Sequence, residues 1–156
     1  MQNSSYQQQA IAGMNGVELI VALYDGMVRF LHRAIEATES GNVEERRIAI
    51  KRVLDILMHL QSRLRMDIGG NSAKALSEFY AAIFALCLEG SRLSSTQRLK
   101  EAIACIRDVR EAWHTISQDP AVIRKLNEEQ SARPAMMLAS APPPSAVQPA
   151  SSSWTA

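Results

Sequence analysis

Four consecutive segments of this chain repeat apolar residues every three or four positions, and short turns separate them. Each segment covers roughly 20–25 residues, which is the length of a bundle helix rather than of a strand. Turns this short make sequential helices antiparallel neighbours. The pattern therefore predicts an all-α protein that folds as an antiparallel up-down four-helix bundle.

Local capping signals set the expected bounds of these helices. Asn15 and Glu18 have the spacing of a capping box, and Asn42 with Glu45 repeats it. Gly41, directly before the second box, is a suitable helix C-cap. The expected helices span residues 15–40, 42–67, 72–92 and, after a break at Ser94 and Ser95, the segment that ends near Ser117.

The two ends of the chain differ from the bundle in composition. Asp119 and Pro120 supply a cap and a first-turn proline for a short fifth helix that ends near Gln130. The residues before the first helix are rich in Gln, Ser and Asn, whereas the last residues hold five of the six prolines among Ala and Ser. The expected division is a flexible arm at 1–14, a helical domain at 15–131 and a disordered tail at 132–156.

A rotation of about 100° per residue places one apolar stripe of each helix toward a shared core. The expected core residues are Ile20, Leu23, Met27, Phe30, Leu31 and Ala34 in the first helix, Ile50, Val53, Leu54, Leu57, Leu60 and Leu64 in the second, Leu76, Phe79, Ile83, Leu86 and Cys87 in the third, and Leu99, Ala102, Ile106, Val109, Trp113 and Ile116 in the fourth.

The first and third helices carry more apolar surface than one buried face needs. On the first helix a second stripe lies roughly 100° from the core stripe, and on the third two residues stand to one side. These additional residues are Val17, Val21, Tyr24 and Val28, with Phe84 and Leu88. One interpretation is that a wide apolar arc wedges between two neighbouring helices. The other is a groove for an apolar partner, since contiguous exposed apolar patches mark interaction sites.

Charge and composition narrow the class of protein. The formal net charge is +1, with 17 basic residues dispersed among 16 acidic ones, which argues against a nucleic-acid partner. No segment has the length and apolarity of a membrane span, and residues 1–10 lack the pattern of a signal peptide. We therefore expect a cytosolic protein without membrane insertion, whose Cys87 and Cys105 are small buried hydrophobic residues.

Two patterns suggest a chemical activity, and each also has a simpler structural explanation. Glu111 and His114 have the spacing of half a di-metal site, but a bundle needs two such pairs and further carboxylates, so no metal or other cofactor is expected. Arg107 and His114 match a loose Arg-x(4–6)-His pattern of helical RNases. A solvated helix margin explains this pair as well, so a helical-bundle RNase stays as the enzymatic alternative, and a self-associating bundle as a third.

An ordered set of motifs resembles the flagellin-specific export chaperones of the bacterial flagellum, the FliS family. The resemblance runs from about Tyr6 to Ile116, and the tail of the chain beyond Gln130 lies outside it. The motifs are, in order, Tyr6, Ile11, Glu18-Leu19-Ile20, Leu23-Tyr24-Asp25-Gly26, Gly41-Asn42-Val43, Gly69-Gly70, Leu76 with Tyr80, and Arg110-Glu111-Ala112-Trp113. Each motif alone is weak, whereas the ordered set with matching spacings is specific.

This resemblance implies a cytosolic bundle without catalytic activity. Such a chaperone binds the disordered C-terminal segment of flagellin in an apolar groove, prevents premature polymerisation and assists delivery to the flagellar type III export gate, whose components are a second class of partner. Two departures stand out: Gly13-Met14-Asn15-Gly16 replaces the family's Thr-Ala-Ser-Pro, and Gly90-Ser91 replaces its Ala-Asn. The sequence leaves open whether the free chain is a homodimer.

The N-terminal arm adds two candidate contacts. Tyr6 and Ile11 are the large apolar or aromatic side chains before Met14, and both match the family pattern. We expect them to dock near the stripe of the first helix. There the arm is either a lid that flagellin displaces or one wall of the groove. The polar run Gln7-Gln8-Gln9 favours the lid.

Overall fold

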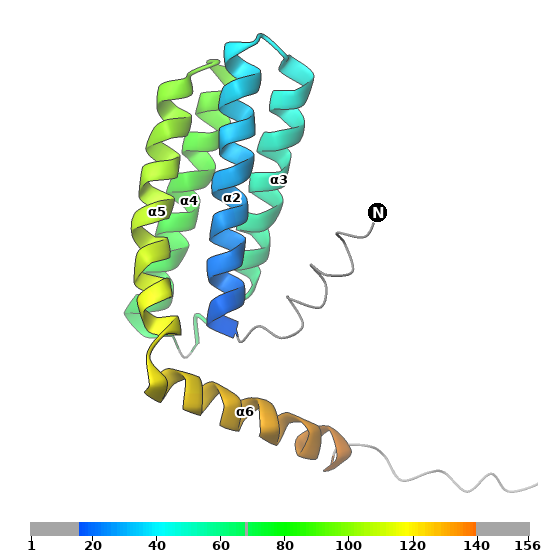
Figure 1. The fold of residues 1–156 in the computed structure, drawn as a ribbon, viewed down its shortest axis with the longest axis vertical. Helices are drawn as coiled ribbons and strands as arrows, with labels where there is room; N and C mark the ends of the chain where they lie inside the picture. The colour runs from blue at the N-terminus through cyan, green and yellow to red at the C-terminus, as the bar shows by residue number, and fades with distance from the viewer. Residues whose placement is uncertain (1–15, 68, 140–156) are drawn as a thin grey trace, which may run out of the picture.

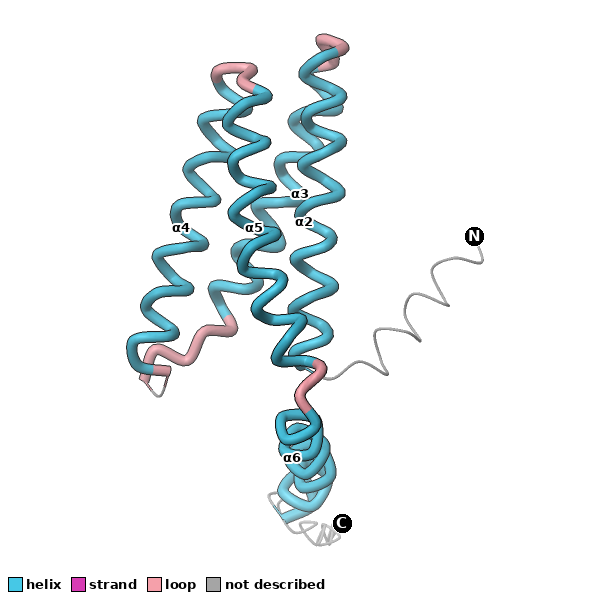
Figure 2. Tube along the Cα trace, turned by 60° about the vertical axis from the view of Figure 1, so that its left-hand side comes forward, coloured by secondary structure: helices cyan, strands magenta, loops and turns pink. Residues whose placement is uncertain are grey.

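The structure is a computed structural model, and it describes residues 16–67 and 69–139. The described residues form five helices and no strand. These are α2 (Gly16–Glu39), α3 (Val43–Ser62), α4 (Gly70–Arg92), α5 (Thr96–Ser117) and α6 (Pro120–Ala139). The first four run side by side in alternating directions (Figure 1), with the loops at the two ends of the bundle (Figure 2). The predicted up-down four-helix bundle is confirmed.

The order of helices around the bundle follows their order in the chain. α2 packs against α3 and α5, and α4 packs against the same two helices, so α2 and α4 stand diagonally opposite. α6 contacts the bundle through α5 and extends away from the bundle's lower end (Figure 1). A side chain that joins α2 to α4 must therefore cross the core.

The turn between α2 and α3 follows the sequence signals. Gly41 adopts φ +71°, where a side chain would be strained, and the N–H of Asn42 donates to the carbonyl of Ala37 at 2.8 Å. The side chain of Asn42 then accepts from the N–H of Glu45 at 3.1 Å. This turn confirms the predicted C-cap and N-cap. The Asn15 cap lies outside the described residues.

The turn between α4 and α5 has the same plan with different residues. Ser94 is the non-glycine residue at positive φ (51°) in the described chain, and the N–H of Ser95 reaches back to the carbonyl of Gly90 at 2.9 Å. Ser95 also caps α5, since its hydroxyl accepts from the N–H of Arg98 at 3.3 Å. The Ser94 hydroxyl accepts from Nη1 of Arg46 at 2.9 Å, which ties this turn to α3.

The end of α3 differs from the prediction. α3 ends at Ser62 rather than near Asp67, because the N–H groups of Arg63 and Leu64 turn to carbonyls three residues back and Arg65 pairs with Asp67 in the loop (2.9 Å).

The last helix is longer than expected. α6 begins as predicted, with Asp119 accepting from the N–H of Ala121 at 2.8 Å and with Pro120 in its first turn. It continues past Gln130 to Ala139, into the segment expected to be disordered. The run after residue 130 contains Ala, Met and Leu, which are strong helix formers, and composition alone underestimated them. The predicted arm at 1–14 and the tail from residue 140 lie outside the described residues.

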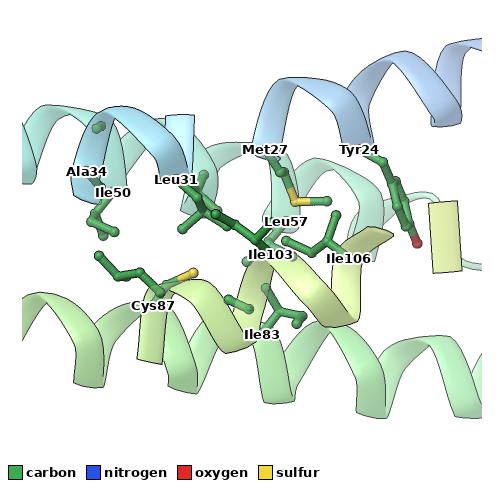
Figure 3. Close-up of a cluster of buried hydrophobic side chains, with 14 of the residues drawn as sticks. Tyr24, Met27, Leu31, Ala34, Ile50, Leu57, Ile83, Cys87, Ile103 and Ile106 are labelled. Atoms are coloured by element: carbon green, nitrogen blue, oxygen red, sulfur yellow. The ribbon is translucent and has the colours of Figure 1, made fainter. Parts of the chain in front are cut away.

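The core confirms most of the predicted stripes. Its fully buried large side chains are Tyr24, Met27, Leu31, Val53, Leu57, Ile83, Cys87, Leu99 and Ile106 (Figure 3). Ile20, Leu23 and Phe30 are only partly buried against this cluster. Because Tyr24 is fully buried and these three residues are not, the buried face of α2 is rotated toward Tyr24 relative to the prediction. On α5, Ile116 was predicted to be buried but is 41% exposed in the last turn.

Gly90 is a point of close approach between α4 and α5. A Cβ atom at this position would lie 2.6 Å from Cδ2 and 2.9 Å from Cγ of Leu99, which is itself fully buried. The branched side chain of Leu99 therefore favours Gly at this position.

We expect Gly90→Ala to destabilise the bundle. Overpacking against Leu99 should cost about 1–3 kcal/mol, which exceeds the gain of about 1 kcal/mol from helix propensity. In a Leu99→Ala background the same substitution should instead be stabilising. Denaturant unfolding of the two single variants and the double variant measures this reversal. A stabilising Gly90→Ala in the wild-type background would contradict the close approach.

Burial of Cys87 makes stability depend on alkaline pH. Desolvation raises the pKa of this fully buried thiol from 9.0 to about 12. The thiol ionises in the unfolded chain first, so its contribution is complete below pH 9 and is lost as pH rises toward 12. Between pH 8 and 10.5 the loss should be about 2 kcal/mol.

The comparison of wild type with Cys87→Ala isolates this contribution from other groups that titrate in the same range. Unfolding free energies at both pH values, measured under reducing conditions, should fall less steeply for the variant. The prediction that both cysteines are buried is wrong for Cys105, which is exposed on α5. Cys105→Ala therefore controls for the removal of a thiol as such. Equal slopes for wild type and Cys87→Ala would contradict the buried, neutral thiol.

Candidate partner-binding site

A hydrogen-bonded group of aromatic residues crosses the lower half of the core. The hydroxyl of Tyr24 on α2 lies 2.9 Å from the hydroxyl of Tyr80 on α4, and either can be the donor. Nε1 of Trp113 on α5 donates to the same Tyr24 hydroxyl at 3.2 Å. Tyr24 is completely buried, so its polar atom needs these partners. Three helices, two of them diagonal neighbours, thus meet at one oxygen atom.

Ring contacts reinforce this group. Phe79 lies next to both tyrosines, with ring centroids 6.4 Å from Tyr24 and 5.6 Å from Tyr80. The two tyrosine rings meet edge to face at 6.3 Å. Burial raises the pKa of both tyrosine hydroxyls above the ordinary value of 10.0, so both stay neutral at physiological pH. The group is therefore suited to fix helix positions rather than to transfer protons.

An ion pair joins α2 and α5 beside the aromatic group. Nε and Nη2 of Arg110 on α5 donate to the two carboxylate oxygens of Asp25 on α2 at 3.0 and 3.3 Å. Nη1 of Arg110 also pairs with Glu111 at 2.8 Å. This two-pronged geometry orients the side chains as well as attracting them. Because Asp25 follows Tyr24 and Arg110 precedes Trp113 by one turn, both contacts fix the same α2–α5 register.

A groove lies between α3 and α4, on the side of the bundle away from this ion pair. It encloses about 470 Å³. Its lining residues include Leu57, Met58 and Gln61 of α3 with Ser77, Tyr80, Ala81 and Phe84 of α4. Most of this lining is apolar, and Nε2 of Gln61 donates to the Ser77 hydroxyl at 2.8 Å near one end. The size and lining suit apolar side chains of a partner.

The structure separates the predicted partner-binding residues into three groups. Phe84 lines the groove and Leu88, one turn further along α4, is 46% exposed. Val17 and Val21 are 9% and 8% exposed but do not belong to the core cluster of the described residues, whereas Val28 is partly buried against that cluster.

Tyr24 requires a correction. The sequence placed it on a second stripe outside the core stripe, whereas the structure buries it completely among core residues. The physical reason is that the apolar arc of α2 wedges between neighbours, as the alternative interpretation held, and that the tyrosine hydroxyl finds partners inside. Tyr6 and Ile11 lie outside the described residues.

The sequence of this chain is similar to those of known proteins. A family profile described as Flagellar protein FliS matches residues 1–120. The chain belongs to the FliS family. Over 126 residues it is 29% identical to the flagellar secretion chaperone FliS of Campylobacter jejuni, covering 78% of this chain and 98% of that protein. Over 111 residues it is 28% identical to the flagellar secretion chaperone FliS of Salmonella typhimurium, covering 70% and 82%. Over 116 residues it is 29% identical to the flagellar secretion chaperone FliSB of Pseudomonas aeruginosa, covering 72% and 92%.

Membership of the FliS family confirms the resemblance inferred from the motifs, and chaperone is a non-enzymatic role. The RNase pattern finds no support in the geometry. Nη2 of Arg107 lies 3.4 Å from Nε2 of His32 rather than next to His114, and all three side chains are on exposed positions. Among the described residues no helix is long and apolar enough to span a membrane, and no group of three His, Cys, Asp or Glu side chains could hold a metal ion.

Two FliS motifs that are far apart in the sequence meet in this site. Leu23-Tyr24-Asp25-Gly26 and Arg110-Glu111-Ala112-Trp113 are joined by the Tyr24–Trp113 and Asp25–Arg110 contacts. Sequence reasoning noted both motifs but missed their contact and also missed the groove. The spacing of Ser77, Ala81 and Phe84, which places small and apolar residues on one side of a helix, was a signal for the groove.

Burial of Tyr24 makes this residue important for the stability of the bundle. On an exposed stripe, Tyr24→Ser with Val21→Asp would leave the melting temperature nearly unchanged. In the core, Tyr24→Ser should cost about 3–5 kcal/mol through the cavity it leaves. Tyr24→Phe should cost about 1–3 kcal/mol, because it leaves the buried Tyr80 hydroxyl and the partly buried Trp113 N–H without this partner. Thermal and denaturant unfolding measure both changes. Wild-type stability in Tyr24→Ser would contradict this placement.

Proposed function

We propose that this chain is a cytosolic flagellar secretion chaperone that binds the disordered C-terminal segment of flagellin. Binding prevents premature polymerisation, and the complex is delivered to the flagellar type III export apparatus. The observation that carries the proposal is the apolar groove between α3 and α4 on a FliS-family bundle. Relatives of this chain are named flagellar secretion chaperones, which supplies the class of cargo.

The groove has the chemistry of a helix-binding surface. Phe84 offers apolar contact area beside the buried Leu57, and Met58, which is 64% exposed, has a flexible side chain that adapts to different partners. A flagellin segment that becomes helical on binding would place residues at i, i+3 and i+4 along it. Binding and release of flagellin need no ATP. Burying about 1,000–3,000 Å² offsets the entropic cost of ordering the flagellin segment and still permits its release.

Apolar surface continues beyond the groove, which suits a long ligand. Leu88 extends it by one turn on α4, and its side chain is about half exposed. Val17, Val21 and Val28 on α2 are proposed as further contacts for flagellin, which would then reach around the bundle. Tyr24 contributes from inside the core. Because Val17 and Val21 are buried without a place in the core cluster, they are suited to a cover that flagellin exchanges with. Tyr6 and Ile11 of the arm are proposed as that cover.

The groove assignment is tested by a charge placed inside it. Ala81 lines the groove, whereas Ala82 is an exposed neighbour on the same helix that does not. Ala81→Arg should weaken binding of a flagellin C-terminal fragment at least about tenfold, which is 1.4 kcal/mol, because the fragment would bury an unpaired charge. Titration calorimetry with matched circular dichroism spectra gives the affinity and controls for folding.

Ala82→Arg is the matched control, since it adds the same side chain to the same helix outside the groove. Its affinity should stay within about twofold of the wild type. Equal affinities for the two variants would exclude the groove as the flagellin site. A wild-type chain that does not bind the fragment would exclude the proposed function itself.

A further inference from the structure

Tyr80 belongs to the groove and to the core at once. Its side chain lines the groove beside Leu57 and Phe84, yet only 4% of the residue is exposed and its hydroxyl is bonded to Tyr24. A ring in this position forms the floor of the groove. The depth and shape of that floor therefore depend on what holds the hydroxyl from behind.

The hydroxyl is held by residues that do not line the groove. Tyr24 on α2 lies 2.9 Å from it, and the indole N–H of Trp113 on α5 fixes the Tyr24 hydroxyl in turn at 3.2 Å. An indole N–H can only donate, so Tyr24 accepts from it, whereas either hydroxyl can be the donor in the bond between Tyr24 and Tyr80. The series Trp113–Tyr24–Tyr80 thus runs from α5 through the core to the groove floor.

The Asp25–Arg110 pair limits how far this series can shift. It joins α2 to α5 next to Tyr24 and Trp113, with both carboxylate oxygens engaged at 3.0 and 3.3 Å. By contrast, the polar contact between the described residues on the two sides of the groove is the Gln61–Ser77 hydrogen bond. The α2–α5 side of the bundle therefore carries more of the polar contacts than the groove side, and the groove floor is hydrogen-bonded to the α2–α5 side.

We propose that Tyr24 and Trp113 are positioning residues for the groove. They fix the position of the Tyr80 ring from inside the core, and so control binding of a ligand that neither of them contacts. This inference rests on the proposed function, because the ligand used to test it is flagellin. Coupling of this kind is reciprocal, so a ligand seated on Tyr80 also stabilises the α2–α5 contacts. Tyr80 is then the element through which the two sides of the bundle communicate.

Substitutions that remove the hydrogen-bonding atom but keep an aromatic ring test the role of the hydrogen bonds. Tyr24→Phe and Trp113→Phe should each weaken binding of the flagellin C-terminal fragment by about three- to tenfold. Ile50→Val is the control, since Ile50 is a buried core residue at the opposite end of the cluster from Tyr24 (Figure 3). Ile50→Val should also lower the stability of the bundle, but without removing a hydrogen bond to the Tyr24 hydroxyl. Its affinity for the fragment should therefore stay within about twofold of the wild type.

A double-variant cycle separates positioning from general loss of stability. If Tyr24 acts through Tyr80, Tyr24→Phe combined with Tyr80→Phe should bind no more weakly than Tyr80→Phe alone. Additive losses, or affinities of Tyr24→Phe and Trp113→Phe equal to that of wild type, would overturn the inference.

A measurement without flagellin keeps this inference separate from the proposed function. The NMR resonances of the Tyr80 ring should shift in Trp113→Phe and stay in place in Ile50→Val. Unchanged Tyr80 resonances in Trp113→Phe would overturn the positioning role even if flagellin binds. Failure of the wild-type chain to bind flagellin would overturn the proposed function, and the Tyr80 resonances would then decide the positioning role alone.

Discussion

The hydroxyl of Tyr24 is the point at which the two diagonal helices of this bundle are joined. In an up-down bundle each helix packs on its two neighbours, and apolar contacts alone allow small sliding between diagonal helices. A buried polar atom with two partners does not allow it, because each displacement leaves a donor or an acceptor unpaired in a medium without water. The lower half of the core is therefore fixed by geometry, and the apolar residues around it supply the driving force.

This fixed point divides the bundle into two unequal sides. On one side, α2 and α5 share the Trp113–Tyr24 hydrogen bond and the Asp25–Arg110 ion pair. On the other, α3 and α4 leave room for a groove over Tyr80 and Phe84. A binding protein needs both, since a surface that adapts to a ligand has to be carried by a scaffold that does not. In this FliS-family chain the division runs along the bundle axis rather than between domains.

Features that depend on neighbours in the sequence could be predicted. Gly41, Asn42 and Asp119 act through bonds to residues a few positions away, so their spacing was sufficient. Periodicity also gave the core positions of Met27, Leu31 and Ile106. Tyr24 could not be placed in this way, because a helical wheel gives an angle but not the distance to a diagonal helix. The groove was missed for the same reason, since its width depends on how far α3 and α4 stand apart. The extension of α6 was missed because composition was given more weight than helix propensity.

The contact between Gly90 and Leu99 has a consequence for how this sequence could have diverged from its relatives. The two positions occupy one space, so neither can be changed freely while the other stays as it is. With the two helices at their present separation, a methyl group at the first position leaves no room for the Leu side chain at the second. We therefore expect the two positions to change as a pair among related chains.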